Sequence, residues 1–216
     1  MPGQAILIGA TGLVGGHCLK ILLERHESVT AIVRRSTGIT HPRLTERRID
    51  FDRLGTIEIP ASAHVYCALG TTIKQAGSEQ AFRRVDFEYP RLLAQHASGT
   101  RGVRFILVSS VGADANSRNF YLRVKGELEA AIQAMPLEAV HIFRPSFLVG
   151  ERSEKRAGEA VGIAVAQALG FLLVGGLRKY RAIEAATVAR SMVATANKDT
   201  AGCFVYHYDE IRKLAD

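Results

Sequence analysis

The sequence predicts an α/β protein built around a doubly wound parallel sheet. Short apolar runs recur along the chain, helix-like stretches separate them, and the first run leads directly into a glycine-rich turn. Most of these runs are continuously apolar, as expected for strands that are buried on both faces. Strands that alternate with helices form a parallel sheet through right-handed crossovers. With 216 residues, of which 47% are hydrophobic, the chain can form one domain with a substantial core.

The order of the predicted elements follows from where these runs begin and end. The strands are expected at residues 5–9, 29–33, 64–69, 103–109 and 139–144. The helices between them are expected at residues 12–25, 78–97 and 121–135, and Pro136 ends the last of these. After Val149 the pattern is less regular, with a helix predicted at residues 185–196 and a strand at residues 203–206.

Glycines at a spacing of three residues follow the first predicted strand and precede a helix. Such glycines permit a tight turn and a close approach of the backbone to a ligand, and the free N–H groups of a helix start bind a pyrophosphate. A dinucleotide-binding loop is therefore predicted, and its contact residues are expected to be Gly9, Thr11, Gly12, Leu13, Val14 and Gly15. Residues 1–150 then form the cofactor-binding core of a single domain, and residues 151–216 form a small C-terminal lobe on the substrate side.

The end of the second strand is where a dinucleotide-binding sheet reads the adenosine ribose. An acidic residue there binds the 2′-hydroxyl of NAD, whereas arginine accommodates the 2′-phosphate of NADP. This chain has Arg34 and Arg35 at that place, which favours NADP(H) over NAD(H) as the cofactor. The alternative is that both are solvated surface arginines. Asp52, together with Phe51, follows the place of a further strand between those at residues 29–33 and 64–69, and is expected to flank the adenine.

Two serines end the strand predicted at residues 103–109, and a tyrosine and a lysine follow on the next helix. Tyr121 and Lys125 are four residues apart and lie on the same helical face. A phenol has an ordinary pKa of about 10, and a neighbouring ammonium lowers that pKa by favouring the phenolate. Tyr121 is thus placed to donate a proton to a carbonyl, while Ser110 or Ser109 hydrogen-bonds the substrate oxygen. Tyr-x-x-x-Lys is common by itself, so its position after the serine pair supports this prediction.

Several segments together resemble the extended and atypical short-chain dehydrogenase/reductases. They are the loop from Gly9 to Gly15, the pair Ser109-Ser110, Tyr121 with Lys125-Gly126, and Arg144-Pro145. A narrower similarity is to the branch that includes the Tat-interacting-protein-type oxidoreductase. It is carried by Cys67-Ala68-Leu69-Gly70-Thr71-Thr72, by Arg84-Val85-Asp86, and by the stretch from Leu107 to Leu122.

This resemblance implies a Rossmann fold that binds NADP(H) and transfers hydride between the nicotinamide and a small carbonyl or alcohol substrate. It implies that Tyr121 and Lys125 form the catalytic pair. The cofactor contacts that it adds are Leu69, Gly70, Thr71, Tyr121, Lys125 and Pro145. Some members of this branch are regulatory proteins, so the alternative function is a non-catalytic NADPH-binding redox sensor that acts through a protein partner.

The basic charge of the chain fits an anionic ligand better than a nucleic acid. The formal net charge is +7, with 21 Arg and 7 Lys, and arginine is well suited to flat anions such as phosphate. A basic helix and stacking aromatics beside the arginines are missing, so no nucleic-acid partner is predicted. The charge is instead expected to steer the dinucleotide toward its cleft. The seven histidines show no ligand spacing, and no metal site is predicted.

The cysteines and one apolar segment bear on location and partners. Cys18, Cys67 and Cys203 form no disulfide framework, which predicts a reducing, cytoplasmic compartment. Residues 160–177 are almost entirely apolar and close to the length that spans a bilayer, but their glycines weaken a helix. A buried or interface segment is favoured over a membrane span. A homodimer or a protein partner would bind through residues 160–177.

Overall fold

The central sheet confirms the predicted fold class. The computed structural model describes residues 3–150, 173–198 and 200–216. Within these residues, seven parallel strands pair in the order β3-β2-β1-β4-β5-β6-β9. They are β1 (Gln4–Ile8), β2 (Ser28–Val33), β3 (Leu44–Arg48), β4 (His64–Cys67), β5 (Arg104–Val108), β6 (Ala139–Phe143) and β9 (Gly202–Tyr206).

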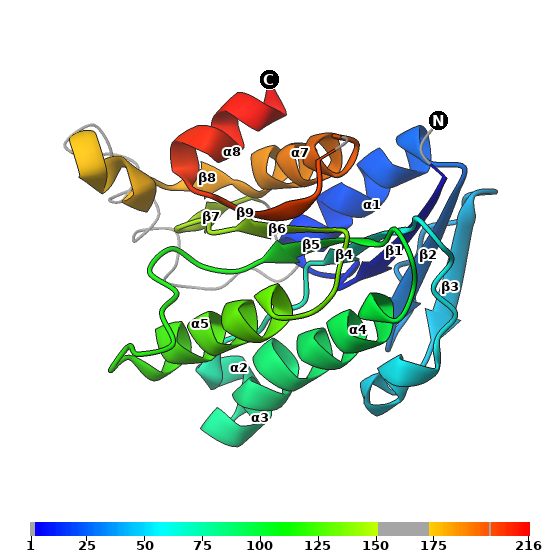
Figure 1. Ribbon diagram of the computed structural model, residues 1–216, viewed down its shortest axis with the longest axis horizontal. Helices are drawn as coiled ribbons and strands as arrows, with labels where there is room; N and C mark the ends of the chain where they lie inside the picture. The colour runs from blue at the N-terminus through cyan, green and yellow to red at the C-terminus, as the bar shows by residue number, and fades with distance from the viewer. Residues whose placement is uncertain (1–2, 151–172, 199) are drawn as a thin grey trace.

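Helices cover both faces of this sheet (Figure 1). One face carries α1 (Leu13–Arg25), α7 (Ala185–Ala196) and α8 (Tyr208–Ala215). The other face carries α4 (Tyr89–Ser98) and α5 (Phe120–Gln133), with the short helices α2 (Ile73–Ala76) and α3 (Glu79–Arg83) beside them. The central strands are therefore buried on both sides, which explains why their sequences are continuously apolar.

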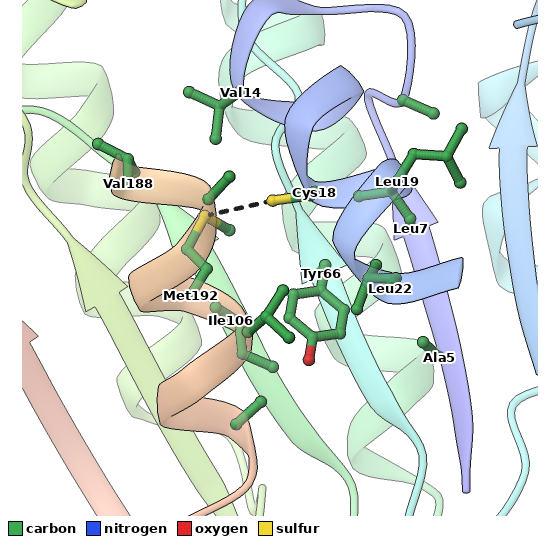
Figure 2. Packing of buried hydrophobic residues seen from close by; sticks show 14 of the residues in the cluster. Ala5, Leu7, Val14, Cys18, Leu19, Leu22, Tyr66, Ile106, Val188 and Met192 are labelled. Atoms are coloured by element: carbon green, nitrogen blue, oxygen red, sulfur yellow. Dashed lines mark hydrogen bonds between the residues drawn. The ribbon is translucent and has the colours of Figure 1, made fainter. Parts of the chain in front are cut away.

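Apolar side chains from α1, α7 and the sheet fill the layer on one side (Figure 2). The Sγ atom of Cys18 on α1 lies 3.9 Å from the Sδ atom of Met192 on α7. Tyr66 of β4 is fully buried in the same layer, together with Leu22 of α1. This packing holds α1 against the sheet, and with it the loop that precedes α1.

The topology places a crevice beside β1. This strand pairs with β2 on one side and with β4 on the other, so the chain continues in opposite directions across the sheet from this point. Ligands of open α/β sheets bind beyond the carboxyl ends of the strands at such a switch point. The glycine-rich loop that follows β1 lies at this edge, where the sequence predicts the dinucleotide site.

The structure differs from the prediction at several elements. The helix predicted over residues 78–97 consists of α3, a π-helical turn (Arg84–Glu88) and α4. Of the residues assigned to the C-terminal part of the domain, β9 joins the main sheet and α7 packs against α1. A separate two-stranded sheet is formed by β7 (Leu148–Val149) and β8 (Ile183–Glu184).

The apolar segment predicted at residues 160–177 lies mostly outside the described residues. Its last part is described, and a 3-10 turn (Gly175–Tyr180) begins there. Val174 and Leu177 are exposed. Among residues 3–150, 173–198 and 200–216, no helix is both long enough and apolar enough to cross a membrane.

Candidate functional site

The loop after β1 has the backbone geometry of a phosphate cradle. Gly9 has a φ of 87°, and a Cβ atom there would lie 2.5 Å from the carbonyl oxygen of Ala68. A Cβ atom on Gly15 would lie 2.0 Å from the carbonyl oxygen of Gly9. Side chains are therefore excluded at both positions, and the loop folds tightly onto the start of α1. The N-terminal N–H groups of α1 are thus presented to the crevice, where they can bind a pyrophosphate.

The predicted loop residues divide into exposed and buried ones. Thr11 and Gly12 are exposed at the crevice, and Leu13 is half-buried. The side chain of Val14 is part of the core between α1 and α7 (Figure 2), so its backbone alone can face a ligand.

A cavity of about 490 Å³ continues from this loop past the end of β2. Thr11, Arg34, Arg35, Phe51 and Leu69 are among the residues that line it. The guanidinium carbon of Arg34 lies 5.4 Å from the centre of the Phe51 ring. The cavity thus offers an aromatic wall and two cations at the place where the sequence predicts the adenosine and its 2′-phosphate.

Asp52 has a different environment from the predicted one. Its carboxylate pairs with the guanidinium of Arg84, which follows α3, and the pKa of Asp52 is lowered by this hydrogen bond. Because the carboxylate is bound to Arg84, Phe51 is the residue of this pair that faces the cavity.

Tyr121 and Lys125 both lie on the first turns of α5, as predicted. Asn119 caps this helix by accepting a hydrogen bond from the N–H of Leu122 at 3.2 Å. Tyr121 is half-buried, and its ring lies 5.6 Å from that of Phe82 on α3. Lys125 is buried one turn further along the helix. The pair therefore combines an accessible phenol with an enclosed ammonium.

A buried carboxylate holds this ammonium. The Nζ atom of Lys125 lies 2.7 Å from Oδ1 of Asp86, and both side chains are almost fully buried. Burial lowers the pKa of Lys125, but the Asp86 carboxylate and the Tyr121 phenol raise it, and the net shift is upward. Lys125 therefore remains an ammonium at neutral pH.

Asp86 was not assigned to the site from the sequence. It lies in the π-helical turn between α3 and α4, and its Oδ2 also accepts a hydrogen bond from the backbone N–H of Thr71 at 2.8 Å. Pro90 is the signal that could have found it. A proline N atom cannot bond the carbonyl of Asp86 four residues earlier, so a distortion is expected at this point.

The two serines at the end of β5 are separated by their contacts. Ser109 is buried, and its hydroxyl donates to the carboxylate of Glu129. Arg144 binds the same carboxylate through Nε at 3.0 Å and Nη2 at 2.5 Å. Ser110 is half-buried, and its hydroxyl lies 3.4 Å from the carbonyl oxygen of Val111. The Ser109 hydroxyl does not reach the site, because it is hydrogen-bonded to the Glu129 carboxylate.

The remaining predicted residues lie on the loops that follow β4 and β6. Leu69, Gly70 and Thr71 follow β4, and Gly70 is exposed. Pro145 follows β6 and is buried, and its carbonyl accepts a hydrogen bond from the N–H of Val111 at 2.9 Å. This bond ties the loop after β6 to the serine loop after β5. Both loops therefore border the same edge of the sheet as the phosphate loop.

Comparison with known families agrees with this geometry. A family model described as NAD(P)H-binding matches residues 9–199, which is most of the chain. The chain belongs to this NAD(P)H-binding family. Its seven-stranded parallel sheet is a Rossmann-like α/β fold, as the resemblance in its motifs implied.

Two curated relatives illustrate its place in the family. Protein HTATIP2 of Rattus norvegicus is 34% identical over 163 residues, which cover 72% of this chain and 67% of the relative. Protein FMP52, mitochondrial, of Candida albicans is 31% identical, with 99% of this chain and 98% of the relative covered. The chain is thus a homologue of the HTATIP2 and FMP52 proteins, and the predicted branch is confirmed.

Solved structures show the same fold. The human epimerase family protein SDR39U1 with NADPH has a TM-score of 0.63 and 16% identity, covering 94% of this chain and 74% of that one. The UDP-glucose 4-epimerase of Thermus thermophilus, in complex with NAD, has a TM-score of 0.68 and 16% identity, covering 98% of this chain and 81% of that one.

The predicted cytoplasmic location is wrong. The FMP52 proteins of Candida albicans and other fungi are named mitochondrial, which contradicts it. The prediction used only the absence of a disulfide framework. Free cysteines indicate reducing surroundings and do not distinguish one reducing compartment from another.

Proposed function

We propose that this NAD(P)H-binding protein is an NADP(H)-dependent oxidoreductase that reduces a small carbonyl compound, or oxidises the corresponding alcohol in reverse. The observation that carries the proposal is the pairing of half-buried Tyr121 with the buried ammonium of Lys125, next to the loop after β4. Such a pair is useful where a proton must reach a substrate oxygen.

The chain's residues fit a dinucleotide cofactor. The tight loop at Gly9 and the start of α1 would hold the pyrophosphate, and the cavity beside Phe51 would hold the adenosine. Arg34 and Arg35 would bind the 2′-phosphate, which supports NADP(H) over NAD(H). Leu69, Gly70 and Pro145 would border the nicotinamide end. When bound, the cofactor supplies or accepts the hydride at the nicotinamide.

The remaining steps belong to the protein. Tyr121 donates its phenolic proton to the carbonyl oxygen as that oxygen gains negative charge. The ammonium of Lys125, one helical turn away, would stabilise the negative charge left on the Tyr121 oxygen and would bond the ribose of the cofactor. Ser110 donates a hydrogen bond to the same substrate oxygen and orients it. Ser109 stays bound to Glu129 and takes no part in proton transfer.

A second candidate is a redox sensor that binds NADPH without turnover and acts through a protein partner. The exposed apolar side chains of Phe147, Val174 and Leu177, on the segments after β6 and before β8, favour it. Large apolar side chains that face solvent are candidates for an interface with a partner. Turnover distinguishes the two candidates.

The test is oxidation of NADPH, followed by its absorbance, with a panel of aldehydes and ketones. The proposal predicts turnover with at least one compound, and Tyr121→Phe should lower kcat about 10²–10⁴-fold while NADPH binding is kept. Tyr208→Phe, which removes a phenol from α8 on the opposite face of the sheet, is the matched control and should be unaffected. Full activity of Tyr121→Phe would exclude this mechanism. Turnover with no compound, combined with an NADPH-dependent change of association state, would favour the sensor.

A further inference from the structure

We propose that Asp86 is a positioning residue that couples the cofactor loop after β4 to the catalytic lysine. One carboxylate binds the ammonium of Lys125 through Oδ1 and the backbone N–H of Thr71 through Oδ2. This inference rests on the proposed function, because it assigns Lys125 and the loop at residues 69–71 to one reaction site.

The contacts of Asp86 reach two separate parts of the site. The distance from Oδ1 to Nζ of Lys125 is 2.7 Å, and that from Oδ2 to the N atom of Thr71 is 2.8 Å. A Cβ atom on Gly70 would lie 3.5 Å from Oδ1 and 3.9 Å from Nζ of Lys125. The loop backbone therefore passes directly over the ion pair. A movement of Asp86 would displace both the lysine and the loop.

The local backbone explains why an aspartate can reach this place. Asp86 lies in the π-helical turn, where the N–H of Tyr89 bonds the carbonyl of Arg84 five residues earlier. Pro90 has no N–H for the carbonyl of Asp86, so a regular α-helical hydrogen bond cannot form there. The wider turn changes the direction of the side chains that follow. Asp86 is turned into the core, where 1% of its side chain remains exposed.

Because Lys125 is buried, its protonation depends on the ion pair with Asp86. A lone ammonium in the core would be destabilised relative to the neutral amine, and a carboxylate at hydrogen-bond distance reverses that preference. The titratable groups that face Lys125 are Asp86 in the π-helical turn, Tyr121 on α5 and Cys67 on β4. Burial raises the pKa of Cys67 to about 12, so its thiol is neutral at physiological pH. Asp86 is therefore the carboxylate that keeps Lys125 charged.

The substitution Asp86→Asn keeps the size of the side chain and removes its charge. The pKa of Lys125 should fall, because burial lowers it and the carboxylate that raises it is gone. Loss of NADPH affinity at alkaline pH should therefore begin at a lower pH than in the wild-type protein, and affinity above neutrality should be about tenfold weaker. The alkaline limb of the kcat/KM profile should shift in the same direction. Asp86→Glu restores a carboxylate. It should return the alkaline limbs of both the NADPH-affinity profile and the kcat/KM profile toward their wild-type positions.

Glu127→Gln is the matched control. Glu127 lies on α5 two residues after Lys125 and pairs with Nη1 of Arg83 at 2.5 Å, but this pair is partly exposed. Removing its charge should leave both alkaline limbs where they are. If Asp86→Asn behaves like Glu127→Gln, the coupling role is wrong.

A measurement on the unsubstituted protein keeps the test valid if Asp86→Asn does not fold. The Cε resonances of carbon-13-labelled lysine are followed against pH, and Lys125 is assigned through Lys125→Arg. The proposal predicts that Lys125 loses its proton at higher pH than the exposed lysines, and an equal or earlier loss overturns it. Because no cofactor is needed, this result stands even if the protein fails to bind NADPH, an outcome that would refute the proposed function alone.

Discussion

At the end of β5, the hydroxyl of Ser109 donates to the buried carboxylate of Glu129, whereas Ser110 has its hydroxyl near the edge of the sheet. The sequence alone could not show which serine faces the core. Successive side chains of a strand point to opposite faces, and the residue at which β5 ends could not be predicted. Glu129, which lies on α5 far along the chain, makes the distinction.

This difference predicts opposite effects of two alanine substitutions. Ser109→Ala should lower the free energy of unfolding by about 1–3 kcal/mol, because the buried Glu129 carboxylate loses its serine donor and keeps only Arg144. Most of the activity should remain. Ser110→Ala should lower kcat and leave stability within about 0.5 kcal/mol of the wild type. Urea unfolding and steady-state kinetics measure the two effects, and an exchange of the two outcomes would assign the catalytic hydroxyl to Ser109.

Other site residues were predictable for identifiable reasons. Tyr121 and Lys125 are four residues apart on one helix, so their common face follows from helical periodicity alone. Gly9 and Gly15 follow from the geometry that a phosphate loop requires. Asp86 did not follow, because its contact with Lys125 joins two distant elements and depends on a local departure from α-helical geometry.

At the scale of elements, buried strands were predicted best. The strands β1, β2, β4, β5 and β6 have continuous apolar sequences because helices cover both faces of the sheet. The edge strand β3 (Leu44–Arg48) has a charged sequence that gives no such signal. Charged side chains are typical of sheet edges, where they oppose pairing with another chain. The position of a third strand was expected, but its residues were not.

Two features of the C-terminal part of the chain, the helix α8 and the position of β9 in the sheet, were not predicted from the sequence. Helix α8 was not predicted, although Asp209 and Glu210 stand in its first turn and Arg212 and Lys213 in its last, as the helix dipole favours. The backbone N–H of His207 also donates to the Glu210 side chain at 3.0 Å. The signals were present but the helix is short. The pairing of β9 with β6 could not be predicted from the local sequence, because the two strands are far apart along the chain.

At the scale of the whole molecule, buried histidines should make stability depend on pH. His26, His64 and His141 are at least nine-tenths buried, and burial lowers the pKa of each to about 4. In the unfolded chain the pKa of histidine is about 6.5. Between these values the unfolded state binds more protons, so stability is fully present above about pH 6.5 and is lost as the pH falls toward 4.

The expected result is a melting temperature that is steady above neutrality and declines steadily from about pH 6.5 downward. Differential scanning fluorimetry at a series of pH values measures it. His26→Gln removes one of the titrating groups and should flatten the decline. His17→Gln replaces a half-buried histidine on α1 that lies nearer the surface, and it should leave the slope as it is. A melting temperature that is constant from pH 7 to pH 4.5 would contradict the proposed burial of neutral histidines.

The net charge of +7 belongs to this scale as well. Arg34 and Arg35 account for part of it at the cavity beside Phe51, where the 2′-phosphate is proposed to bind. Several other arginines pair with carboxylates. Arg144 binds Glu129, Arg83 binds Glu127 and Arg178 binds Asp209. The excess of arginine over lysine is therefore used for both an anion site and paired carboxylates.

The most direct test of the central claim is titration of the purified protein with NADPH and with NADH, followed by nicotinamide fluorescence. The account predicts saturable binding with NADPH tighter, and the double substitution Arg34→Ser and Arg35→Ser should remove about 10–100-fold of that preference. Arg101→Ser, which removes an exposed arginine just before β5, should change nothing. Equal affinities in the wild-type protein would contradict the role of the two arginines, and no binding of either dinucleotide would contradict the proposed function.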